Sequence, residues 1–163
     1  MSPLIRAPGA ARRCLTVALV ATLPLQWPVH AAESMLQTTT SWDGGALAYP
    51  AGEAEVTSVI LRIEEGQEPP FHCHPVPTMG YVLSGAVEVE TREGKKAVFE
   101  AGQSVVEVMK TVHRGRALGG PVEIVVFYAG AVALPNTVLP EDDPEHVYCA
   151  PPAGKGAMER PHG

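Results

Sequence analysis

The sequence predicts an all-β domain, built as a sandwich or barrel of short strands. Between residues 55 and 128, short runs rich in β-branched residues recur at near-regular spacing. Glycine and proline turns separate these runs, and no window shows a sustained helical period. Such a pattern is typical of sandwiches and barrels, and 163 residues are enough for one domain with its own core.

The first strand is expected over residues 55–63, where Val59, Leu61 and Ile63 share one face. A turn over residues 64–70 then leads into a histidine-containing stretch. Further strands are expected at residues 81–83, 86–90, 96–100, 104–109, 113–116 and 122–128. Turns at 92–95, 101–102 and 119–121 connect several of them.

The two ends of the chain differ from this core. Residues 1–31 combine a positive start, an apolar run over 14–25 and small residues before Ala31, which is the order of a secretory signal. The run is too short and too proline-broken to span a bilayer, and a buried N-terminal helix is the alternative. We expect an N-terminal arm over 32–50, a barrel over 51–133 and a proline-rich, acidic tail over 134–163 that covers the barrel or is disordered.

The charge balance restricts the partners. Cleavage after Ala31 would remove three of the 12 basic residues and none of the 18 acidic ones, leaving a net charge of about −9. An acidic domain without a basic stripe argues against nucleic acids and anionic membrane surfaces. We therefore expect a periplasmic or secreted protein without a membrane span.

His72 and His74 are the first candidate site. Residues i and i+2 of a strand point to one face, so the two imidazoles would aim at one point, as a metal ion requires. His113 follows at the start of a later strand. A metal-free barrel with hydrogen-bonded histidines is the alternative, although three converging imidazoles would repel one another when protonated.

These residues give the chain a resemblance to the cupins. The first cupin motif is a glycine, five residues, His-x-His, three or four residues, a glutamate, six residues and a glycine. Gly66, His72, His74 and Gly85 stand at this spacing. Gly102 and His113 stand at the spacing of the second motif. The resemblance covers roughly residues 51–133 and implies a double-stranded β-helix, or jelly-roll, barrel.

The chain departs from the cupin motifs at several positions. Thr78 occupies the place of the glutamate, which is the usual fourth protein ligand, while Val108, Lys110 and Ala117 replace the proline, glycine and asparagine of the second motif. A site of three histidines with open positions remains. Such a site suits one divalent transition metal, and Fe, Mn, Zn, Ni, Cu and Co cannot be told apart from the ligands alone.

Glu107 is the candidate for a replacement carboxylate, because it interrupts the apolar run 105–109. Inside the barrel it could act as a catalytic base or contact a metal-bound histidine. The alternative is a solvated face, and the altered turn before His113 leaves the direction of the side chain open. If Thr78 keeps the inward direction of the motif glutamate, Gly80 lies on the same face and both line the pocket.

Other titratable residues are expected to lie away from the metal. Alternation from an inward His113 sends Arg114 and Arg116 to the opposite face, and His146 is expected at the surface of the tail. Cys73 alternates with the two histidines and would face away from their metal. A disulfide between Cys73 and Cys149 is compatible with export, and the sequence leaves it open.

Two functions remain in view. The resemblance implies dioxygenases, isomerases and decarboxylases, and a three-histidine site favours an oxygenase-type enzyme acting on a small molecule. The alternative is a non-catalytic module that binds a small ligand or a metal ion. In either case cupins commonly pair through strand edges, so a homodimer is expected.

Overall fold

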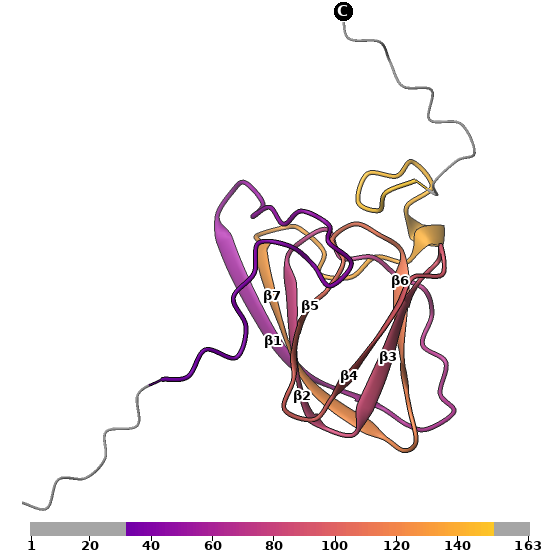
Figure 1. Cartoon of the computed structure of the whole chain (residues 1–163). Coiled ribbons are helices and arrows are strands. Elements are labelled where there is room, and N and C mark those ends of the chain that lie inside the picture. The colour runs from indigo at the N-terminus through magenta and orange to yellow at the C-terminus, as the bar shows by residue number, and fades with distance from the viewer. Residues whose placement is uncertain (1–31, 152–163) are drawn as a thin grey trace, which may run out of the picture. The chain divides into compact units, whose positions relative to one another are not determined.

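The computed structural model describes residues 32–151, so the expected signal at 1–31 and tail residues 152–163 lie outside the described part (Figure 1). The described chain is all-β apart from one turn of 3-10 helix, η1 (Pro140–Asp142). Its strands are β1 (Ala54–Ile63), β2 (Thr78–Ser84), β3 (Ala86–Thr91), β4 (Lys96–Glu100), β5 (Ser104–Val106), β6 (His113–Ala117) and β7 (Val122–Ala131).

Two antiparallel sheets form the barrel. One sheet has the strand order β1-β7-β2-β5 and the other β4-β3-β6, and the two lie on opposite sides of a common interior (Figure 1). The chain passes from the first sheet to the second at Gly85, where φ is +75° and a Cβ atom would lie 2.3 Å from the carbonyl oxygen of Pro121. The predicted all-β double-stranded β-helix is confirmed.

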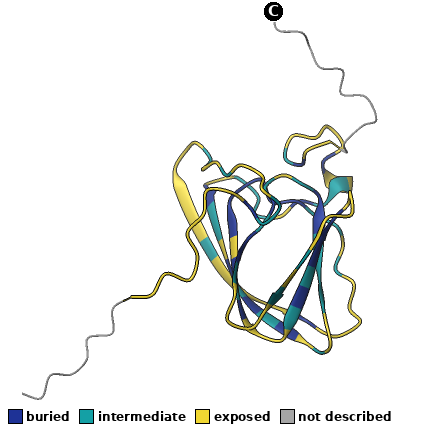
Figure 2. Ribbon diagram, in the orientation of Figure 1, coloured by how far each residue is buried: buried dark blue, intermediate teal, exposed yellow. Residues whose placement is uncertain are grey.

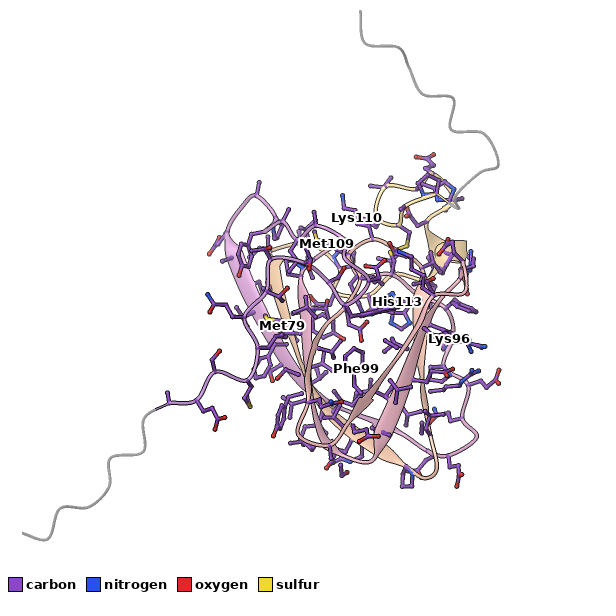
Figure 3. All side chains as sticks on the ribbon, in the orientation of Figure 1. Met79, Lys96, Phe99, Met109, Lys110 and His113 are labelled. Carbon is purple, nitrogen blue, oxygen red and sulfur yellow. A yellow bond between two sulfur atoms is a disulfide. The ribbon has the colours of Figure 1, made fainter. Side chains whose placement is uncertain are left out.

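Alternation along the strands determines which side chains enter the barrel. The main apolar cluster comes from both sheets and contains Ile63, Val82, Val87, Val122, Ile124 and Val126, with Phe99, Ala117 and Tyr128 packed against it. Figure 3 shows Phe99 and His113 between the two sheets. By contrast β1, at the edge of its sheet, is exposed along most of its length (Figure 2). Within residues 32–151, no helix has the length and apolar character needed to cross a bilayer.

Some expected strand boundaries were wrong, and the backbone around the histidine pair is irregular. The strand expected over 104–109 ends at Val106, because Lys110 takes a φ of +61° and its N–H binds the carbonyl oxygen of His74. Residues 72–74 form isolated bridges rather than a regular strand, since each pairs with a different segment. Conversely, β7 continues to Ala131, because it pairs with β1 along its whole length.

The flanking segments are held against the barrel. In the arm, the N–H of Trp42 binds the carbonyl oxygen of Val106, the last residue of β5, at 3.0 Å. In the tail, Cys149 forms a disulfide with Cys73. Both cysteines are buried in a second apolar cluster with Val112 and Val138. The disulfide that the sequence left open is therefore present, and Cys73 faces away from the histidine rings as expected.

Candidate metal centre

His72, His74 and His113 converge inside the barrel. Their ring centroids are 4.7 to 5.0 Å apart, and one nitrogen of each ring lies within 4.8 Å of the other two. The bridge between His72 and His113, with a hydrogen bond in each direction, holds two of the rings side by side. The backbone thus brings together residues some forty positions apart.

In each histidine ring, a hydrogen bond to a backbone carbonyl oxygen determines which nitrogen carries the proton. Nδ1 lies 3.0 Å from the oxygen of Pro70 in His72, 2.8 Å from that of Asn136 in His74 and 2.8 Å from that of Thr111 in His113. A carbonyl oxygen can only accept, so Nδ1–H must donate. Each neutral ring therefore keeps its lone pair on Nε2, which is the form that ligates a metal.

The surroundings also favour the neutral rings. Burial lowers the pKa of all three histidines, most strongly for His74. For His72 and His74 the charge of a neighbouring imidazolium lowers the pKa further. Because a protonated imidazole cannot bind a metal, these shifts keep the ligands available near neutral pH.

Glu107 adds a carboxylate to this cluster. Its Oε2 lies 3.6 Å from Nε2 of His113, and the side chain is only 18% exposed. The residue follows β5 directly, and its N–H is fixed by the carbonyl oxygen of Thr78 at 2.9 Å. The structure therefore places Glu107 in the cavity and not on the solvated face, the two alternatives that the sequence left open.

Burial raises the pKa of Glu107 to about 7, and the imidazole of His72 and the indole of Trp42 lower it in part. Oε2 and the indole Nε1 of Trp42 are nevertheless buried without a hydrogen bond of normal geometry to any described residue. A buried carboxylate oxygen without a partner is costly. A cation, or a water molecule or ligand bound to one, would satisfy it.

These features fit one divalent transition metal. Three imidazole nitrogens with fixed tautomers supply the ligands, and the unsatisfied carboxylate supplies a negative charge beside them. A set of three protein ligands leaves coordination positions free, as catalytic metal sites do.

A cavity of about 210 Å³ adjoins the histidines. Thr78 and Gly80 of β2 line it, as does Tyr128 of β7. The hydroxyl of Thr78 donates to the carbonyl oxygen of Val76, so it replaces the missing motif glutamate only in position. The ring of Tyr128 meets that of His74 edge-on, with centroids 5.5 Å apart.

The remaining candidates lie outside the cavity. Arg114 and Arg116 point away from it and form ion pairs with Glu90 and Glu88 of β3. His146 is exposed in the tail. Neither the arginines nor His146 can touch a metal held by the three histidines.

Sequence reasoning missed three contributions to the site. Tyr128 could have been found, because it alternates with Ile124 and Val126 on the inward face of β7. Trp42 and the carbonyl of Asn136 carried no sequence signal. They reach the site from the irregular arm and tail, whose path depends on tertiary contacts.

Parts of this chain are similar to known proteins. Residues 59–128 match the family described as "Cupin domain", and no curated protein matches the chain. Similar solved structures include a DMSP lyase from Ruegeria pomeroyi, with 21% identity and a TM-score of 0.47 over 61% of this chain and 48% of that one. An oxalate decarboxylase from Lactobacillus farciminis has 18% identity and a TM-score of 0.44. The similarity covers 52% of this chain and 26% of the decarboxylase. A protein with a double-stranded β-helix domain from Klebsiella pneumoniae has 23% identity and a TM-score of 0.44. The similarity covers 58% of this chain and 75% of that protein.

Proposed function

Taking residues 59–128 as a cupin domain, we propose that the chain is an exported, metal-dependent enzyme acting on a small molecule. One divalent metal would be held by His72, His74 and His113, with oxygenase-type chemistry as the favoured reaction. The observation that carries this proposal is the convergence of three tautomer-fixed imidazoles beside a buried, unsatisfied carboxylate.

A bound metal would supply a Lewis acid with positions open to substrate. Glu107 would accept and return a proton at Oε2, and in the metal-free protein burial raises the pKa of its carboxyl group to about 7. Trp42 would direct its indole N–H toward the ionised carboxylate. The aliphatic walls of the cavity would keep bulk water from the reacting groups.

Export is supported by the disulfide between Cys73 and Cys149, because such bonds persist in oxidising compartments. We therefore propose a periplasmic or secreted location, with residues 1–31 as the signal. We further propose a homodimer, since β1 is an edge strand that exposes Val56 and Ile60. Light scattering of the mature chain should give twice the monomer mass, and a monomer would contradict the pairing.

The competing proposal is a binding module that uses the same metal without catalysis. The absence of the motif glutamate at Thr78 favours it. The two proposals differ at Glu107, which is required for proton transfer in the enzyme and dispensable for holding a ligand in the module.

Glu107→Gln separates the two. The Fe(II)-loaded protein would be tested for oxygen uptake with small enolisable and catecholic compounds, and binding of the unreactive chelator acetohydroxamate would be measured alongside. The enzyme proposal predicts turnover that falls at least about 100-fold in Glu107→Gln, with chelator affinity nearly unchanged. Glu100→Gln, at an exposed residue of β4, is the matched control.

If Glu107→Gln turned over a substrate at the normal rate, the role assigned to Glu107 would fail. If the loaded wild-type protein bound chelators but transformed no compound of the panel, the binding module would be favoured.

A further inference from the structure

We propose that the cavity takes a small, largely aliphatic molecule that carries one metal-binding head group and no second charged group. The inference rests on the proposed metal site and specifies the class of its substrate. It follows from which side chains form the cavity wall, and from where the cationic side chains of the barrel are held.

The cavity wall has two chemically different parts. Its polar side chains belong to the histidine cluster or touch it: Glu107 lies beside His113, and Tyr128 and Thr137 lie beside His74. The hydroxyl of Thr78 donates its hydrogen bond to the backbone carbonyl oxygen of Val76. The rest of the wall is aliphatic and consists of Leu61, Ile63, Pro69, Gly80, Val87, Val89, Val105, Gly115, Ile124 and Val126. One end can bind a polar head, and the rest can only accept apolar groups.

No lysine or arginine lines the cavity among the described residues. Arg114 and Arg116, the arginines closest in sequence to His113, point out of the barrel. Arg114 pairs with Glu90 and Glu68, and Arg116 pairs with Glu88. A second carboxylate on the substrate would therefore be buried against aliphatic walls without a counter-ion, which is strongly unfavourable. A substrate cation would find only Glu107, which already faces the metal ligands.

Two glycines stand in the cavity wall where an added side chain would press against its neighbours. A Cβ at Gly80 of β2 would approach Val105 Cγ1 at 3.0 Å and Ile124 Cγ2 at 3.3 Å. A Cβ at Gly115 of β6 would approach Val87 Cγ2 at 3.2 Å. Both sheets thus lack a side chain where the cavity is narrow. At about 210 Å³ the cavity is smaller than the usual range for drug-sized ligands, which limits the substrate to a short chain or a small ring.

The opening of the cavity is also lined by apolar side chains. Leu61 lines the cavity and is 43% exposed, so it stands where the interior meets solvent. Pro69, from the turn before the histidines, also lines the cavity. An apolar molecule would meet aliphatic surface from the opening to the metal.

The test uses the Co(II)-loaded protein, whose visible spectrum reports ligands on the metal. The probes are acetohydroxamate, butanohydroxamate and hexanohydroxamate, with succinate monohydroxamate as the charged counterpart of the butano compound. We expect affinity to rise about threefold to fourfold for each added methylene until the cavity is full. The probe with the terminal carboxylate should bind at least 100-fold more weakly than its uncharged counterpart.

Two variants sharpen the result. Gly115→Ala should weaken hexanohydroxamate binding and leave acetohydroxamate binding unchanged, because only the apolar end is narrowed. Leu61→Arg places a cation at a position that is already partly exposed, so it should improve binding of the carboxylate-ended probe and weaken that of hexanohydroxamate. Val98→Arg, at an exposed residue of β4 outside the cavity, is the control for added charge.

The possible failures are distinguishable. A cobalt spectrum that does not depend on His72 would overturn the proposed metal site, and this inference with it. A normal His72-dependent spectrum with affinities independent of chain length would overturn the inference alone. Equal or tighter binding of the carboxylate-ended probe to the wild-type protein would do the same.

Discussion

At the scale of single residues, the three histidines are prepared for a metal by the carbonyl oxygens that face their Nδ1 atoms. Those of Pro70 and Thr111 come from residues two positions before their histidines, whereas that of Asn136 comes from the tail. These two bonds are local, because each joins a histidine ring to the backbone two residues earlier. The distant bond makes the orientation of His74 depend on a segment outside the barrel strands.

Glu107 provides a prediction for the metal-free protein. Burial raises its pKa from 4.5 to about 7, so between these values the folded chain holds a proton that the unfolded chain has lost. The contribution of Glu107 to the free energy of unfolding should therefore fall as the pH rises from about 4.5 to above 7, whereas the lowered pKa of the three histidines acts in the opposite direction. Glu107→Gln should remove this fall and stabilise the metal-free protein at pH 8 by up to about 3 kcal/mol.

Urea unfolding at pH 5 and pH 8, with a chelator present, measures this difference. Glu100→Gln on β4 should keep the pH dependence of the parent. If the free energy of unfolding of Glu107→Gln changed between pH 5 and pH 8 by the same amount as that of the parent, the carboxylate would be solvated.

The sequence predicted the histidines but not the direction of Glu107. His72 and His74 are separated by one residue, so any extended backbone sends them to one side. Glu107 stands before a turn that lacks the usual proline and glycine, where Lys110 takes a left-handed conformation. The regular alternation of inward and outward side chains stops there. It therefore could not show whether Glu107 points into the cavity or toward solvent.

At the scale of elements, the tail after β7 supports the candidate metal centre. Cys73 stands between His72 and His74, its backbone pairs with Val138, and its side chain is bonded to Cys149. The same tail carries the carbonyl of Asn136 to His74. The segment after β7 therefore holds the histidine pair in place from the outside of the barrel.

Removing the disulfide should affect both stability and metal binding. Cys73→Ser/Cys149→Ser releases a cross-link between residues 76 positions apart, which should cost about 2–5 kcal/mol. Loss of the support to His74 should weaken metal binding about tenfold or more. Urea unfolding and competition with a metal-binding dye measure the two effects, and Val147→Ala in the same segment is the control. Metal affinity equal to that of the parent would mean that the tail does not orient His74.

Asp143 provides a pH-dependent prediction for the tail. Its carboxylate accepts the N–H groups of Val147, Tyr148 and Cys149, and these bonds, that of Cys149 first, hold its pKa below the ordinary 3.8. A lowered pKa adds stability above the ordinary value, and this stability is lost as the pH falls through the folded one. Asp143→Asn should therefore loosen residues 143–149 at pH 7 and remove their acid sensitivity.

Amide hydrogen exchange of this segment, corrected for intrinsic rates, measures the loss. Unchanged protection in Asp143→Asn would show that the carboxylate does not hold the tail. Asp142→Asn, at the exposed neighbouring residue, is the matched control.

Strand positions were predictable where alternation is regular and failed where tertiary pairing decides. The strand at 96–100 was placed correctly because a hairpin turn and a glycine turn bound it. The strand expected over 104–109 stops at Val106, and residues 72–74 are tied to three separate segments. Neither exception has a local sequence cause that periodicity could detect.

At the scale of the whole molecule, two sheets enclose one cavity that has a polar, histidine-lined end and aliphatic walls. The four-stranded sheet supplies Leu61, Gly80 and Tyr128, and the three-stranded sheet supplies His113 and Gly115. Neither sheet could form the site alone. A metal held at the histidine end is therefore the central claim, because the proposed chemistry and the proposed substrate class both depend on it.

The metal content of the mature protein, purified from its native compartment without an affinity tag, tests this claim most directly. We expect about one equivalent of a transition metal per chain, lost in His72→Ala/His113→Ala and retained in His146→Ala, which changes an exposed histidine of the tail. No metal in the parent or the double variant, with both proteins folded, would contradict the account and leave a metal-free barrel.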